Sequence, residues 1–223
     1  MKLSSYIKGR RAFLGSVALG SATVVAGCQF SGRAQNTSPV SSSLVVGDQW
    51  VAKINGKHKQ VFDAVNPSKG WGAAFALNYL DTAEEFENLT DKDFSAVVVM
   101  RHFAMPLAVN DAMWAKYKIG EAIGVTDPKT NAPATRNIFY NNIPLRPGLT
   151  YEKMIAERGV IMVICNLALK VVSGMAADQV GLPKEQAEKD FRNGLFQGID
   201  IAPSGVYAVN RAQEAGCTYC YAG

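Results

Sequence analysis

One cysteine ends a short apolar run and is the residue best placed for chemistry. The run Val160–Ile164 follows Gly159, which stops a helix, and it is too short for a buried helix. It therefore predicts a buried parallel strand that Cys165 ends. Asn166 is a favourable N-cap for a helix predicted over Leu167–Ala177, so the thiol lies where backbone N–H groups and the helix dipole favour a thiolate.

His102 follows a second predicted buried strand, Phe94–Met100. Ligands of open α/β sheets bind outside the carboxyl ends of the strands, and we expect the strands that end near His102 and Cys165 to be neighbours. A nearby histidine could depress the pKa of the thiol or carry its proton. The alternative also stands, because free cysteines are common in protein cores and His102 would then only close a loop.

The other two cysteines after residue 28 form a C-x-x-C spacing, Cys217 and Cys220. Redox and metal pairs need both sulfurs at a helix start or a tight knuckle. This pair falls in a predicted strand, where an offset of three sends the side chains to opposite faces. Core packing and a reactive thiol near the end of the sequence are the alternatives to pairing.

A long segment with four prolines, Val125–Gly148, predicts no regular element and has the length of a functional or partner-binding loop. Its side chains Arg136, Tyr140 and Arg146 could bind an anionic group or form a subunit contact. Solvated loop charges are the alternative.

Several classes of function lack their motifs in this chain. It has no G-x-G-x-x-G after a strand, no P-loop and no G-x-S-x-G, so the dinucleotide, P-loop and hydrolase classes lose their main support. His58 and His102 are the only histidines, which excludes a histidine-rich metal site. We predict neither a metal nor a cofactor, and the chemistry that is left is sulfur chemistry.

The first 27 residues predict a signal peptide. A basic start precedes a small apolar stretch too short to span a membrane, and Arg10-Arg11 with Phe13-Leu14 resembles a twin-arginine signal. Cys28 closes a lipobox-like Val-Ala-Gly-Cys, which predicts a lipid anchor at Cys28, followed by a flexible tether through residue 46. An ordinary cleavage site with an incidental cysteine is the alternative. We therefore expect a membrane-anchored periplasmic protein.

The charge of the chain belongs to this leader. Its four basic residues account for the whole net charge of +4, so nothing after it points to nucleic acid. Export also leaves an odd number of cysteines after Cys28, which leaves at least one thiol free or paired with another molecule. Cys165 is the natural candidate.

Residues 47–223 predict one α/β domain in which strands and helices alternate. The expected strands are Lys59–Ala64, Phe94–Met100, Val160–Ile164, Ile199–Ile201 and Cys217–Tyr221. The expected helices are Trp71–Glu87, one capped by Asn110 and reaching Ile123, Tyr151–Arg158, Leu167–Ala177, Pro183–Leu195 and Gly205–Ala215 capped by Ser204. This order favours a three-layer α/β/α fold with a mostly parallel five-stranded, flavodoxin-like sheet.

Two segments of the last third carry a resemblance to a known family. Arg158-Gly159-Val160 leading a strand into Cys165-Asn166-Leu167-Ala168, and Ser204-Gly205-Val206 leading a helix into a terminal aromatic strand, resemble the DsrE/DsrF/DsrH-like family of sulfur-relay proteins. The resemblance implies assembly as trimers or hexamers and, in the sulfur-trafficking members, a cysteine that carries persulfide sulfur and corresponds to Cys165. The export signal, the tether and the proline-rich segment depart from the family pattern.

Two hypotheses of function follow. In the first, the exported protein is a sulfur relay or handles thiols, with Cys165 as the persulfide-carrying residue and possible protein partners that donate or accept sulfur. In the second, it is a non-catalytic oligomeric module that binds a small ligand in a strand-edge cleft roofed by the proline-rich segment, and Cys165 is only a wall residue.

Overall fold

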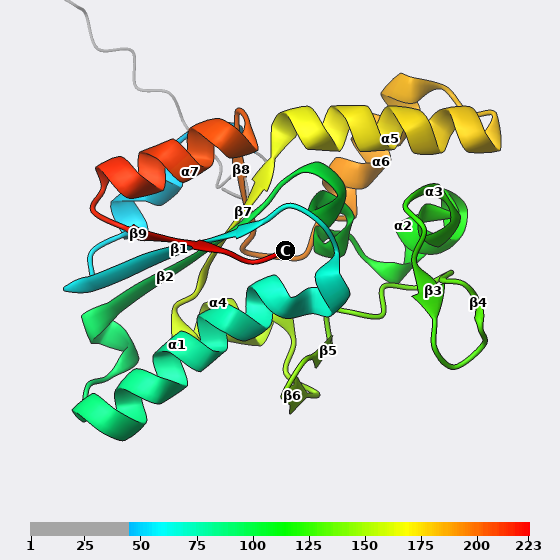
Figure 1. Ribbon diagram of the computed structural model, residues 1–223. Helices are drawn as coiled ribbons and strands as arrows, with labels where there is room; N and C mark the ends of the chain where they lie inside the picture. Colours follow the sequence, from blue (N-terminus) through cyan, green and yellow to red (C-terminus); the bar gives the residue numbers. More distant parts are fainter. Residues whose placement is uncertain (1–44) are drawn as a thin grey trace, which may run out of the picture. The chain divides into compact units, whose positions relative to one another are not determined.

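The computed structural model describes residues 45–223 and contains a five-stranded parallel sheet in the order β8-β7-β2-β1-β9 (Figure 1). The strands are β1 (His58–Ala64), β2 (Phe94–Met100), β7 (Ile161–Cys165), β8 (Asp200–Ala202) and β9 (Thr218–Tyr221). All four pairings between neighbouring strands are parallel. The predicted mostly parallel five-stranded sheet is confirmed.

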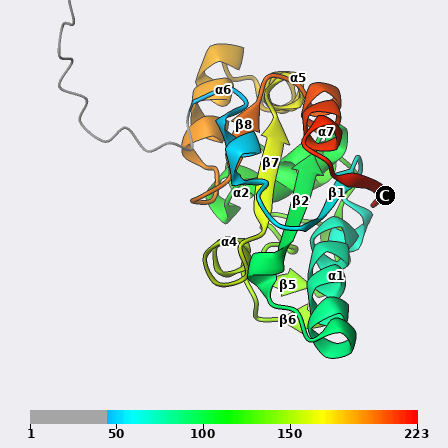
Figure 2. The same cartoon turned by 90° about the vertical axis from the view of Figure 1, so that its left-hand side faces the viewer.

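The α-helices and 3-10 helices (η) cover both faces of this sheet. The α-helices are α1 (Trp71–Glu87), α2 (Asp111–Lys116), α3 (Ile119–Ala122), α4 (Tyr151–Arg158), α5 (Asn166–Val180), α6 (Lys184–Asn193) and α7 (Gly205–Glu214), and the 3-10 helices are η2 (Gln49–Lys53), η3 (Ser68–Gly70), η4 (Asp91–Asp93) and η5 (His102–Ala108). Helix α7 lies over one face, and α1 and α4 lie over the other (Figures 1 and 2). The fold is therefore a three-layer α/β/α fold of flavodoxin-like type.

Alternation along the strands explains how one sheet supports two cores. Val97 and Val99 of β2 pack with Trp50 of η2 and with α7, whereas Val98 and Met100 pack on the side of α1. Successive strand residues point to opposite faces, so a strand covered on both sides is apolar along nearly its whole length. Every residue of β2 is buried, which is why its sequence shows no polar alternation.

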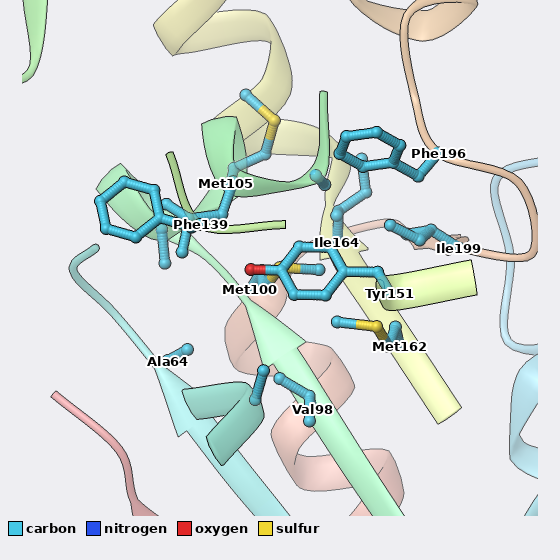
Figure 3. Packing of buried hydrophobic residues seen from close by; sticks show 14 of the residues in the cluster. Ala64, Val98, Met100, Met105, Phe139, Tyr151, Met162, Ile164, Phe196 and Ile199 are labelled. Atoms are coloured by element: carbon cyan, nitrogen blue, oxygen red, sulfur yellow. The ribbon is translucent and has the colours of Figure 1, made fainter. Parts of the chain in front are cut away.

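The larger core lies on the α1 side and includes the proline-rich segment. Figure 3 shows Tyr151 of α4 lying among Met100, Met162 and Ile164, with Phe139 beside Met105. Burial raises the pKa of the Tyr151 hydroxyl far above its usual range, so the phenol stays protonated.

Asn137 fastens the proline-rich segment to the rest of the domain. Its side chain is 1% exposed and donates to the backbone oxygens of Leu107 and Val109, at 2.8 Å each, while its backbone N–H donates to Asp111. Two antiparallel pairs of two-residue strands also form in the segment, β3 (Thr126–Asp127) with β4 (Ala132–Pro133) and β5 (Asn142–Ile143) with β6 (Arg146–Pro147). The expectation of no regular element was therefore wrong for these short pairs.

The helix predicted after Asn110 divides into two. Asn110 caps α2 as expected, with its side chain accepting a hydrogen bond from the Met113 N–H, but Lys118 takes a left-handed conformation with φ 48° and separates α2 from α3. Smaller differences are that β8 lies one residue later than predicted, β9 begins after Cys217, and α6 and α7 end two residues and one residue earlier.

The predicted signal peptide, the lipidation site Cys28 and all but the end of the tether lie outside the described residues. Pairing begins at the last tether residue, because Val46 forms a parallel bridge with Ile201 and the Gly47 N–H donates to the Ile201 oxygen at 2.9 Å. Within residues 45–223, none of the helices combines the length and the apolar character needed to cross a bilayer.

Candidate functional site

The candidate site lies at the carboxyl edge of the sheet, where β2 and β7 end side by side. Met100 and Ile164 are paired across these strands, so the residues that follow, Arg101 and Cys165, are the next neighbours. Adjacent strands lie about 4.8 Å apart. The residue that the register brings to Cys165 is therefore Arg101 and not His102, the predicted partner.

Cys165 caps the helix that follows it. Its Sγ accepts a hydrogen bond from the Ala168 N–H at 3.1 Å, its backbone is extended, and the residue is 6% exposed. Because Asn166 is already the first residue of α5, the prediction that Asn166 is the N-cap was wrong by one position. The sulfur itself accepts from one of the helix N–H groups that have no partner within the helix.

A buried carboxylate holds Arg101 in place. Its Nε and Nη2 donate to the two carboxylate oxygens of Asp63 at 2.7 and 2.9 Å, and the Tyr219 hydroxyl donates to the same carboxylate at 2.9 Å. The Asp63 side chain is 3% exposed and the Arg101 side chain 27%. The hydrogen bonds that Arg101 donates to Asp63 raise the pKa of the guanidinium, and the charges of Asp63, Tyr219 and Cys165 add, in that order, to the same shift. The guanidinium is therefore held in its charged form beside Cys165.

The start of α7 lies against the stem of Arg101. Ser204 caps this helix by accepting from the Tyr207 N–H at 3.2 Å, and Gly205 is its first residue. A Cβ atom on Gly205 would lie 2.3 Å from the Cβ of Arg101, so this close approach requires glycine. Helices α5 and α7 also contact each other. Two helix N-termini and one guanidinium therefore surround the carboxyl end of β7.

His102 and Asn166 take other positions. His102 is exposed, opens η5 with φ 50°, and packs its ring against Phe103 with 4.2 Å between centroids. The Asn166 side chain accepts a hydrogen bond from Arg192, which also binds Glu188. Each has a structural partner within the chain.

The predicted binding residues of the proline-rich segment are also engaged. Arg136 pairs with Asp127 at 3.0 Å, and Arg146 pairs with Asp81. Tyr140 stacks on Phe196 with 4.5 Å between ring centroids. Arg146 and Tyr140 hold the segment to the rest of the domain, Arg136 pairs within the segment, and the three side chains have separate partners.

Cys217 and Cys220 are free thiols that belong to the two opposite cores, as the strand spacing predicts. Burial raises the pKa of Cys217 to about 11 and also raises that of Cys220. Cys217 therefore stays a neutral thiol at physiological pH, which suits core packing.

Sequence reasoning missed Asp63 and Arg101 as members of the site. The sequence did contain a signal for Asp63, because it is a charged residue among the apolar residues that end β1. A buried carboxylate needs a partner of opposite charge or a hydrogen-bond donor. The alternation of β2 would have placed Arg101, two residues after Val99, on the α7 face. Within residues 45–223 no three His, Cys, Asp or Glu side chains are grouped to hold a metal ion.

Comparisons with known proteins assign no family to this chain. No model of a protein family matches it, and no curated protein matches it. A solved structure that resembles it is a protein of unknown function from Methanobacterium thermoautotrophicum, with 13% sequence identity and a TM-score of 0.38. The match covers 74% of this chain and 98% of the archaeal protein.

Proposed function

We propose that the protein is a sulfur-relay protein of the DsrE/DsrF/DsrH-like family in which Cys165 accepts a sulfane sulfur and passes it on. The observation that carries the proposal is that a cysteine sulfur occupies a helix N-cap beside an arginine. Serine, threonine, aspartate and asparagine are the preferred N-caps, and sulfur is a weak acceptor. A cysteine in this position stabilises the helix only slightly as a cap. The reactivity of its thiol is therefore the better explanation for a cysteine at this position.

The surroundings suit an anionic sulfur. A persulfide carries its negative charge on the outer sulfur, one bond beyond Sγ, and the Ala168 N–H, the dipole of α5 and the Arg101 guanidinium all stabilise negative charge nearby. Asp63 fixes the direction of the guanidinium, so the arrangement exists before sulfur arrives. Asp63 is in this sense a positioning residue.

The transfer has two steps that balance. The Cys165 thiolate attacks the terminal sulfur of a polysulfide, forming a new S–S bond while the old one breaks and a polysulfide shorter by one sulfur leaves. The thiolate of an acceptor then attacks the outer sulfur of the persulfide, and the Cys165 thiolate leaves. No external oxidant or reductant is consumed.

Intact-mass measurement after incubation with polysulfide tests the proposal. We expect wild-type protein to gain the mass of one sulfur and to lose it to an added thiol, whereas Cys165→Ser gains none. Cys217→Ser and Cys220→Ser are the matched controls and should load like wild type, because burial raises both of their pKa values. Undiminished loading of Cys165→Ser would rule out Cys165 as the carrier.

We also propose that the protein acts in the periplasm as a lipoprotein exported by the twin-arginine pathway. The supporting observations are the residues Arg10, Arg11 and Cys28 of the sequence. Replacing both arginines by lysine should block export, and Cys28→Ala should move the exported protein from the membrane fraction to the soluble periplasm. Membrane retention of Cys28→Ala would contradict the anchor.

We propose in addition that the protein forms a homo-oligomer, and the resemblance implies a trimer or hexamer. Leu167, Val171 and Met175 support this, because they are 44% to 59% exposed and lie at spacings of four along α5. Light scattering of the mature protein should give a multiple of the chain mass. Val171→Glu should lower that mass and Lys170→Glu, on the same helix, should not; a monomeric wild type would contradict the proposal.

A further inference from the structure

A cleft of about 680 Å³ lies between the loop that follows β1 and the proline-rich segment. Pro67, Ser68 and Lys69 form one wall, and residues of α3's end and of the segment form the others. None of these lining residues comes from β7 or α5, so the cleft can be considered without Cys165. Its volume falls in the range of small-molecule sites, roughly 300 to 1,000 Å³.

Apolar side chains make up most of the inner wall. Ile123, Val125 and Ile138 are partly buried and pack against the main core, and Phe139 is 7% exposed. These positions are fixed from behind by the core and by the hydrogen bonds of Asn137. A ligand with an apolar body would therefore find a preformed surface and would bury area on it.

Lys69 gives the cleft its charge. It is the only ionisable residue in the lining of the cleft, and it takes part in no ion pair among residues 45–223. The nearest acid in the segment is Asp127, but its side chain is 7% exposed, pairs with Arg136 at 3.0 Å and accepts from the Lys129 N–H at 2.9 Å. The carboxylate of Asp127 is thus already paired, and Lys69 carries the only charge among the residues that line the cleft.

Neutral polar groups line both sides of the cleft. Ser68 lies beside Lys69 on one wall, and Thr126 and Asn142 belong to the proline-rich segment on the other side. Hydroxyl and amide groups can donate hydrogen bonds to an oxyanion beside the ammonium. The cleft therefore combines an apolar surface with a cationic, donor-rich part.

We propose that this cleft binds a small organic anion with an apolar body, such as an aromatic or medium-chain carboxylate or sulfonate. Lys69 pairs with the anionic group, and Ile123, Val125 and Ile138 hold the apolar part. The inference is independent of the sulfur-relay proposal, because neither Cys165 nor Arg101 takes part in it.

Calorimetric titration with naphthalene-1-sulfonate, octanoate and the neutral 1-naphthalenemethanol tests the site. We expect both anions to bind wild type and the neutral probe to bind at least several-fold more weakly. Lys69→Gln should weaken the anions about tenfold, as expected for the loss of one charge-assisted hydrogen bond. Thr126→Trp should abolish binding by filling the cleft.

Lys118→Gln is the matched control, because Lys118 is also an exposed lysine with a left-handed backbone that precedes a helix. It should bind all probes like wild type. Equal binding by Lys69→Gln and wild type, equal affinity for the neutral probe, or retained binding in Thr126→Trp would overturn the proposal. So would the absence of binding by both anions at millimolar concentration.

Discussion

The N-termini of α5 and α7 are built alike but differ in the atom that caps them. Cys165 Sγ accepts from the N–H three residues on at 3.1 Å, and Ser204 Oγ does the same at 3.2 Å. Both caps have extended backbones, and both lie at the ends of strands of the same sheet: Cys165 is the last residue of β7, and Ser204 comes two residues after β8. An oxygen satisfies this role well and a sulfur poorly, so the difference marks the α5 cap as the position with a second role.

The first helical residues differ for a physical reason. Gly205 of α7 lies against Arg101 and leaves no room for a side chain, whereas Asn166 of α5 reaches Arg192. The second residues, Val206 and Leu167, are both strongly exposed. Arg101 thus contacts one N-terminus directly and is the neighbour, by strand register, of the cysteine that caps the other.

Removing the carboxylate beneath Arg101 should have the largest effect on stability. Asp63→Asn leaves the guanidinium without its ionic partner, and we expect a loss of about 3 kcal/mol in the free energy of unfolding. Asp200→Asn is the control, because Asp200 pairs with the exposed Lys53 and should lose less than about 1 kcal/mol. Urea unfolding measures both. Equal losses would show that the ion pair between Arg101 and Asp63 stabilises the fold no more than a surface ion pair does.

Gly205→Ala should have the next largest effect, because the added Cβ would lie 2.3 Å from the Cβ of Arg101 and must push α7 or the arginine aside. We expect a loss of about 1 to 3 kcal/mol from this overpacking. Asn166→Ala, at the equivalent position of α5, should lose about 1 kcal/mol or less, since Arg192 keeps Glu188. Thermal unfolding distinguishes them, and a larger loss for Asn166→Ala would contradict the close approach.

The fold could be predicted from the sequence because its strongest signals are local. The fully buried β2 and β7 are apolar apart from Ser95, Gly159 ends α4 in a left-handed conformation, and the Asn110 side chain caps the start of α2. The split between α2 and α3 could not be predicted, because it depends on a left-handed Lys118, which is costly for a residue with a side chain.

The site was harder to predict, because its members meet through register. Cys165 and its strand-edge position follow from the sequence, but Arg101 rather than His102 becomes its neighbour only once Met100 is paired with Ile164. The position of the N-cap was wrong by one residue because a helix can begin one residue earlier without any change in the sequence pattern that predicts it. Contacts between residues distant in sequence, such as Asp63 and Tyr219, can be predicted only when the order of the strands in the sheet is known.

Alkaline pH tests Cys217, the buried thiol that only packs in the core. Burial raises the pKa of Cys217 from 9.0 to about 11, so the folded state holds this proton when the unfolded state has lost it. The stabilisation is complete below pH 9 and is lost as pH rises from 9 to 11. We expect wild type to lose roughly 1 kcal/mol more than Cys217→Ala between pH 8 and pH 10.

Urea unfolding across this range measures the difference, and parallel pH profiles for the two proteins would contradict it. The pKa of Tyr79 is also raised, first by burial and next by the charge of Cys217, so Cys217→Ala lowers this second contribution as well and the two proteins are compared below the usual tyrosine pKa of 10.0. Cys165→Ala offers a further comparison with Cys217→Ala, because it lacks the hydrogen bond from the Ala168 N–H at every pH.

Exchanging the two capping atoms should have the smallest effect on stability and sharpens the comparison most. Cys165→Ser keeps an acceptor for the Ala168 N–H and Ser204→Cys keeps one for the Tyr207 N–H, so each should change the free energy of unfolding by less than about 1 kcal/mol. Ser204→Ala, which removes its cap, should lose about 1 kcal/mol. Only Cys165→Ser should also abolish sulfur loading. If Cys165→Ser instead loses more than about 2 kcal/mol and Ser204→Cys loses little, the sulfur is needed for packing, and the alternative of an inert core cysteine is correct.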